Sequence, residues 1–164
     1  MKSIVLGIGN KTNGDDGVGI FVIEKLAHSE KNKKEMINKN QFLLVDCGIV
    51  PENYTSIIRK HHPDRVILVD AADMQLIPGS YRIIPPEKVS VMNFSTHSIP
   101  LSVFISFIHQ STDEVILIGI QPMLMEPGTP ISAGVTEAGE RVARFIINDE
   151  LNKIRPLEEG RPIS

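Results

Sequence analysis

Short apolar runs alternate along this chain with longer stretches in which apolar residues recur every three or four positions. The run at 65–69 is the clearest, because it is continuous and β-branched, as expected of a strand covered on both faces. The stretch at 17–28 instead places Val18, Phe21 and Leu26 on one face at helical spacing. The whole pattern predicts strands at 3–7, 42–45, 65–69, 80–84 and 114–118, and helices at 17–28, 52–61, 99–109 and from an N-cap at Ser132 to about Asn152.

The segments between these elements are polar or rich in proline. Residues 29–41 carry four lysines and predict a solvated connection, whose role the sequence leaves open. Residues 121–131 predict a proline-rich loop. A Pro78-Gly79 turn precedes the strand at 80–84 and two prolines end it, so this strand is expected at an edge of the sheet.

Strands that alternate with helices predict an α/β fold, a three-layer αβα sandwich around a mostly parallel sheet with an antiparallel edge strand. A chain of 164 residues fits a single domain, which we place at 1–155, followed by a flexible tail at 156–164. Right-handed crossovers bring the connections after the first and third strands to the same edge. Ligands of such sheets bind outside the carboxyl ends of the strands, so chemistry is expected there.

Three side chains that can bind a metal or move a proton fall at this edge. Asp16 lies between the first strand and the first helix, Asp70 ends the third strand, and His97 comes just before the helix at 99–109. Two carboxylates and an imidazole suit zinc, nickel, manganese or iron. The same groups could equally work as general acids and bases without a metal.

Each of these residues also has a simpler explanation. Asp15 or Asp16 can cap the first helix, a contribution of about 0.5–2 kcal/mol. An aspartate after a strand often forms a turn, and a lone histidine is more often structural. Their joint position favours a functional interpretation of the three residues, and Asp46, which ends the second strand, stays a fourth candidate. Asp15 and Asp73 are interpreted as local caps.

Composition narrows the classes of function. The chain has 17 basic and 20 acidic residues and a formal charge of −3, which gives no electrostatic case for a nucleic-acid partner. Its one cysteine, Cys47, excludes an internal disulfide and is interpreted as a small buried residue. No apolar run reaches the ~18 residues of a membrane span, and no secretory signal is recognisable. We therefore expect a cytoplasmic monomer that is not inserted in a membrane.

Several known motifs fit poorly. The turn at Gly7-Ile8-Gly9 begins like a dinucleotide fingerprint, but Thr12 takes the third glycine's place and an acidic pair would repel the pyrophosphate. No nucleophile elbow, Walker loop or His-Glu-x-x-His motif occurs. With no Trp and two Tyr, the chain offers few anchors for a pure binding module. The opening at 6–10 resembles that of peptidyl-tRNA hydrolases, and such a hydrolase, or another metal-assisted hydrolase, is the alternative function.

A series of short motifs runs in one order from residue 3 to about 147. As a set they resemble the [NiFe]-hydrogenase maturation endopeptidases, and the second and fourth point to the hydrogenase 3 type subgroup. The motifs are Gly7-x-Gly9-Asn10-x3-Gly14-Asp15-Asp16-Gly17-x-Gly19, Pro51-Glu52-Asn53, Val69-Asp70-Ala71-x-Asp73-Met74, Pro78-Gly79, Thr96-His97-x-x-Pro100-Leu101 and Gly119-Ile120-Gln121-Pro122.

The resemblance implies that Asp16, Asp70 and His97 bind nickel and form the catalytic site. Many relatives carry glutamate in place of Asp16, and aspartate keeps an oxygen ligand with a shorter reach. These proteases remove a C-terminal extension from the hydrogenase large-subunit precursor after nickel insertion, and their fold is a twisted five-stranded sheet flanked by helices. We therefore expect nickel to be carried by the precursor, with no organic cofactor. A metal-polarised carbonyl or an aspartate-activated water would lead to hydrolysis.

Overall fold

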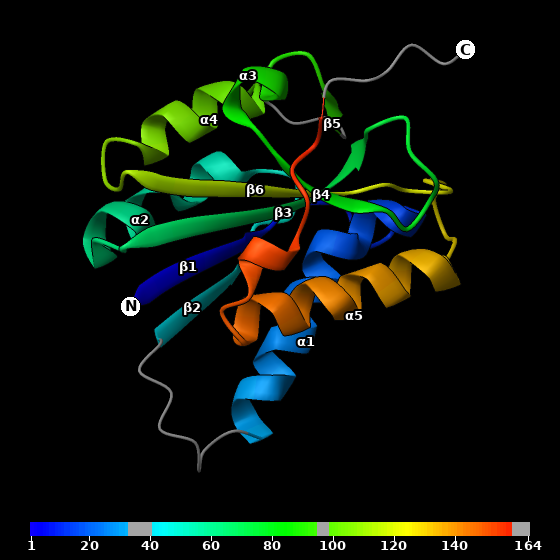
Figure 1. The fold of residues 1–164 in the computed structure, drawn as a ribbon, viewed down its shortest axis with the longest axis horizontal. Coiled ribbons are helices and arrows are strands. Elements are labelled where there is room, and N and C mark those ends of the chain that lie inside the picture. The colour runs from blue at the N-terminus through cyan, green and yellow to red at the C-terminus, as the bar shows by residue number, and fades with distance from the viewer. Residues whose placement is uncertain (33–40, 95–98, 159–164) are drawn as a thin grey trace.

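The computed structural model describes residues 1–32, 41–94 and 99–158, and its strands form one twisted sheet between two layers of helices (Figure 1). The strand order is β2-β1-β3-β6-β4, in which β4 alone on this path runs antiparallel to its neighbour. This confirms the predicted three-layer sandwich, its mostly parallel sheet and its antiparallel edge strand, which is β4. The strands are β1 (Lys2–Gly7), β2 (Gln41–Asp46), β3 (Arg65–Asp73), β4 (Tyr81–Ile84) and β6 (Glu114–Ile120).

The helices cover both faces of the sheet, and each face has its own apolar core. Side chains of α1 and α5 pack with Val5, Ile67 and Val69 on one face, whereas those of α2, α3 and α4 pack with Leu6 and Leu68 on the other. The helices are α1 (Val18–Asn32), α2 (Thr55–His61), α3 (Pro86–Val89), α4 (Leu101–Ile108) and α5 (Ala133–Ile147), and three 3-10 turns are η1 (Gly14–Gly17), η2 (Pro51–Tyr54) and η3 (Leu151–Lys153). No helix in the described part of the chain is both long and apolar enough to cross a membrane.

The strand order reverses between β1 and β3. From β1 the chain passes through α1 to β2 on one side, and from β3 it continues to β4 and β6 on the other. Connections therefore diverge at the carboxyl ends of these two central strands, which is where ligand crevices form in open α/β sheets. Asp16 follows β1 and Asp70 lies near the end of β3, so the fold places both at this point.

The last helix and the tail differ from the prediction. The helix α5 ends at Ile147 instead of about Asn152, because Asp149 has a φ of 56° and turns the chain out of the helix. The predicted tail is paired at its start: the Ile83 amide donates to the Arg155 carbonyl at 2.9 Å, and the Leu157 amide donates to the Ile83 carbonyl at 2.8 Å. The chain thus covers the outer edge of β4, and residues 159–164 lie outside the described residues.

Smaller differences concern the lengths of elements. The first helix runs four residues further than predicted, to Asn32. Strands β3 and β6 extend to Asp73 and Ile120, beyond the apolar runs that predicted them. A two-residue strand, β5 (Asn93–Phe94), pairs antiparallel with the end of β3 and has no signal in the sequence.

Candidate active site

Glycines bring the start of α1 onto the ends of β1 and β3. A Cβ on Gly19 would lie 2.4 Å from the Ile8 carbonyl oxygen and 2.5 Å from that of Val69, so only glycine fits there. Gly9 has a φ of 147°, and a Cβ on it would lie 1.9 Å from the Asp16 carbonyl oxygen. These close approaches fix the backbone of Asp16 beside the turn after β1 and bring the same turn against the end of β3.

Asp16 and Asp70 are both buried at this edge. Their exposed fractions are 3% and 0%. The Oδ1 atom of Asp16 is buried and has no hydrogen-bond partner among the described residues. A buried carboxylate oxygen left without a donor is costly, and its retention favours a role with a ligand or a substrate.

The Asp15 carboxylate is hydrogen-bonded to the loop between β6 and α5, far along the chain. Its Oδ2 accepts hydrogen bonds from the amides of Met123 (2.8 Å) and Leu124 (2.9 Å) and from the Ser132 hydroxyl (2.8 Å). Its Oδ1 accepts from the Ser132 amide at 2.6 Å. The interpretation of Asp15 as a helix cap is therefore wrong. Ser132 does precede α5, but its side chain makes no cap bond and donates to Asp15 instead.

Substitution of Asp15 should weaken the fold in a pH-dependent way. Burial raises the pKa of Asp15, but hydrogen bonds from Leu124, Ser132 and Met123 lower it by more, so the pKa lies below its ordinary value. The stabilisation is then complete above the unfolded pKa of about 4 and is lost as the pH falls through the folded value. Asp15→Asn should lower the free energy of unfolding at pH 7 by about 3 kcal/mol.

Urea unfolding of both proteins at pH 7 and pH 3 measures this effect. The difference in unfolding free energy between wild type and Asp15→Asn should narrow at pH 3, because the unfolded wild type takes up a proton at Asp15 below its unfolded pKa of about 4. A gap of the same size at both pH values would contradict the assignment of Asp15 as an ionised anchor.

Three other polar residues at this edge have local roles. Asp46 is exposed and its Oδ1 accepts from the Gly48 amide at 2.9 Å, which is a turn contact. Asp73 likewise accepts from the Gln75 amide at 3.1 Å. Burial, with the charges of Asp46 and Glu52, raises the pKa of the Cys47 thiol to about 12, so Cys47 stays protonated, in line with its interpretation as a buried small residue.

The third predicted site residue, His97, lies outside the described residues. Within residues 1–32, 41–94 and 99–158, no three His, Cys, Asp or Glu side chains lie close enough together to hold a metal ion. The structure thus brings Asp16 and Asp70 to one sheet edge, and the position of His97 relative to them stays a prediction.

Gln121 is a buried polar residue to which the sequence did not assign a role. Its Oε1 accepts from the amides of Met74 (2.7 Å) and Leu76 (3.3 Å), and its Nε2 donates to Asp73 at 3.3 Å. It therefore fixes the turn after β3, a few residues beyond Asp70. A glutamine between a buried strand and Pro122 is the signal that could have indicated this role.

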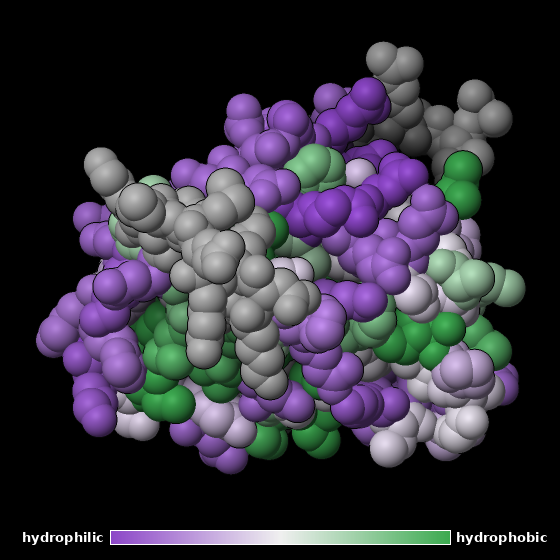
Figure 2. Space-filling view, turned by 90° about the horizontal axis from the view of Figure 1, so that it is seen from below, coloured by the Kyte–Doolittle hydropathy of each residue, from purple (hydrophilic) through white to green (hydrophobic). Residues whose placement is uncertain are grey.

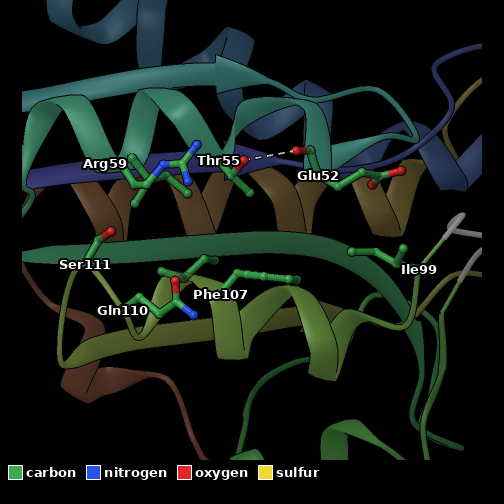
Figure 3. A pocket seen from close by; sticks show the side chains of 9 residues that line it. Glu52, Thr55, Arg59, Ile99, Phe107, Gln110 and Ser111 are labelled. Carbon is green, nitrogen blue, oxygen red and sulfur yellow. Dashed lines mark hydrogen bonds between the residues drawn. The ribbon is translucent and has the colours of Figure 1, made fainter.

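A groove of about 230 Å³ opens between α2 and α4. Figure 3 shows Glu52 and Ile99 at one end of it, Arg59 and Gln110 toward the other, and Phe107 on the α4 side. Glu52 belongs to the turn after β2, so this end of the groove faces the carboxyl edge of the sheet. Asp16, Asp46 and Asp70 do not line the groove, which lies on the α2 and α4 face of the sandwich.

Comparison with known proteins gives one consistent result. A family model described as hydrogenase maturation protease matches residues 21–149. The hydrogenase 3 maturation protease of Escherichia coli K12 is 36% identical over 143 residues, covering 87% of this chain and 86% of its own length. A crystal structure of a hydrogenase 3 maturation protease superposes with a TM-score of 0.84 at 32% identity and covers 97% of this chain and 98% of its own. A crystal structure of a [NiFe] hydrogenase maturation protease from Thermococcus kodakarensis superposes with a TM-score of 0.75 at 33% identity. It covers 91% of this chain and 92% of its own.

Proposed function

The chain belongs to the hydrogenase maturation proteases, and from this premise we propose that it removes the C-terminal extension of a [NiFe]-hydrogenase large-subunit precursor after nickel insertion. The proposed substrate is a precursor processed by the hydrogenase 3 type of protease. The observation that carries the proposal is the pair of buried carboxylates, Asp16 and Asp70, at the point where the strand order reverses.

The carboxylate pair fits recognition of nickel held by the precursor. The buried Oδ1 of Asp16 has no donor among the described residues, so it has an acceptor site to offer to a cation. Asp70 contributes oxygen from the neighbouring strand, and the sequence adds the imidazole of His97 as a third group. Carboxylate oxygen and imidazole nitrogen are ligands that divalent nickel accepts. We treat the nickel as part of the substrate, because the precursor would present it.

Hydrolysis at this edge needs a base and a water molecule. In the proposed reaction a carboxylate of the pair accepts a proton from water, and the water oxygen attacks the carbonyl carbon of the peptide bond. The C–N bond then breaks, and the proton passes to the leaving amine. The products are a mature subunit with a new carboxyl terminus and a free peptide with a new amino terminus. The buried position of both carboxylates limits competing solvation of the base.

The test compares nickel-loaded with nickel-free precursor. Each form is incubated with the protein, and the mass of the precursor is measured over time. We expect a loss of mass from the nickel-loaded form alone. Equal cleavage of both forms would contradict nickel recognition, and cleavage of neither would contradict the protease activity on this substrate.

The same assay tests the site residues. Processing by His97→Ala at the wild-type rate would contradict the assignment of His97. Nickel dependence that persists in Asp70→Asn would remove Asp70 from the site and favour Asp46, which lies at the same edge. Rates are compared at equal protein concentration, after circular dichroism has shown that each variant is folded.

A further inference from the structure

Large apolar side chains are exposed around the candidate site. Ile49 follows β2, Ile77 follows β3, and Met123, Leu124 and Met125 follow β6, so all lie beyond the carboxyl ends of parallel strands. Their exposed fractions range from 42% to 81%. Figure 2 shows hydrophobic surface at the right-hand end of the molecule, the end toward which the parallel strands of Figure 1 point. We name these five residues the apolar rim. Residues 123–125 are its contiguous part, and contiguous apolar exposure marks interaction surfaces in soluble proteins.

The largest part of the rim is held in place by its backbone. The amides of Met123 and Leu124 donate to the Asp15 carboxylate, and the Asp15 amide donates back to the Leu124 carbonyl at 2.9 Å. A Cβ on Gly14 would lie 2.6 Å from that same carbonyl oxygen, so the loop lies directly against the turn that holds Asp16. The backbone is therefore fixed while the side chains stay in solvent.

A fixed backbone with exposed apolar side chains suits binding. The loop loses little conformational entropy when a partner covers it, because its backbone is ordered beforehand. Methionine side chains are flexible and polarisable, so they adapt to partners of different shape. Apolar side chains left in water cost free energy, so their exposure here favours a partner that covers them.

The position of the rim identifies its occupant. Asp15, which anchors the rim loop, directly precedes Asp16 in the sequence. Ile77 lies in the connection after β3, the strand that carries Asp70. A polypeptide whose peptide bond reaches these carboxylates would lie beside the rim, because the loop at 123–125 packs against the turn that holds Asp16. We propose that the apolar rim binds an apolar, extended stretch of the precursor next to the cleaved bond, an inference that rests on the proposed function.

The test substitutes two rim residues and measures binding and processing separately. Met123→Gln with Met125→Gln keeps side-chain length but adds an amide to each exposed tip. In an Asp16→Asn background, which is expected not to cleave, we expect the Kd for nickel-loaded precursor to rise about tenfold. With Asp16 intact, KM should rise by a similar factor while kcat stays within about twofold. Val103→Gln, an exposed apolar position on α4 outside the rim, is the matched control and should change neither constant.

The outcomes separate this inference from the proposed function. An unchanged Kd in the rim variant overturns the inference, as does a loss of kcat at constant KM, since the loop would then act only by positioning Asp16. Self-association of the wild-type protein that the rim substitutions abolish without a change in KM assigns the rim to a second copy and also overturns it. Failure of the wild-type protein to process nickel-loaded precursor contradicts the proposed function, whereas the Kd comparison still decides whether the rim binds the polypeptide.

Discussion

Asp16→Asn is expected to reduce processing at least a hundredfold while the protein stays as stable as wild type or becomes more so. The activity falls because the amide can neither accept a proton from water nor offer an anionic oxygen to a cation. The fold does not suffer, because the buried Oδ1 has no donor to lose among the described residues. Removal of a buried carboxylate without a hydrogen-bond donor lowers the desolvation penalty of folding. We therefore expect the free energy of unfolding to rise by up to about 1 kcal/mol.

Asp46→Asn is the matched control for this substitution. Asp46 lies at the same sheet edge but is exposed, and its turn contact with the Gly48 amide needs one oxygen, which asparagine keeps. Its kcat/KM should stay within about twofold of wild type. The measurements are precursor mass over time and urea unfolding at pH 7. A marked loss of stability in Asp16→Asn, or a matching loss of activity in Asp46→Asn, would contradict the assignment of Asp16 as a reactive group.

Gly19→Ala is expected to destabilise the protein by about 3 kcal/mol or more. The added methyl would meet two backbone carbonyl oxygens, those of Ile8 and Val69, at 2.4 and 2.5 Å. Neither can rotate away as a side chain could, so α1 must move off the ends of β1 and β3. Because Asp16 lies in the 3-10 turn that leads into this helix and Asp70 follows Val69, processing should fall as well, even below the temperature at which the variant unfolds.

Two further helical glycines provide a graded comparison. A Cβ on Gly134, near the start of α5, meets nothing within 4 Å, so Gly134→Ala should be neutral or stabilising by up to about 1 kcal/mol. A Cβ on Gly139 would lie 2.8 Å from the ring of Phe21, which can shift, so the effect of Gly139→Ala should be intermediate. Thermal unfolding followed by circular dichroism ranks the three. A Gly19→Ala variant no less stable than Gly139→Ala would contradict the close approach at the site.

The positions of Asp16 and Asp70 could be predicted because they follow from local pattern and chain handedness. Apolar runs identify the strands, and the right-handed crossover rule then decides which strand ends meet. The direction in which each carboxylate points is not contained in that argument. Asp15 and Asp16 are adjacent and chemically identical, yet one is fully hydrogen-bonded and the other keeps a free oxygen.

The role of Asp15 could not be predicted because its partners lie far along the chain. The Met123 and Ser132 groups that it binds are 108 and 117 residues away, in a loop with no periodic pattern. The same holds for residues 155–157, which join β4 through backbone groups that any sequence carries. Backbone pairing of this kind depends on tertiary placement, which hydrophobic periodicity does not report.

The anchor at Asp15 also separates the surface of the following loop from the position of the neighbouring Asp16 carboxylate. Leu124 and Ser132 are bound to the same carboxylate, so residues 125–131 form a closed excursion whose two ends are fixed at one point. The entropy of closing such an excursion changes slowly with its length. Exposed side chains such as Met125 can therefore be exchanged without displacing the neighbouring carboxylate, whereas the Gly128 amide, which donates to the Thr12 carbonyl at 2.9 Å, ties the middle of the excursion to the turn before Asp16. We therefore expect substitution of exposed side chains at 125–131 to change the binding of a partner more than it changes the position of Asp16.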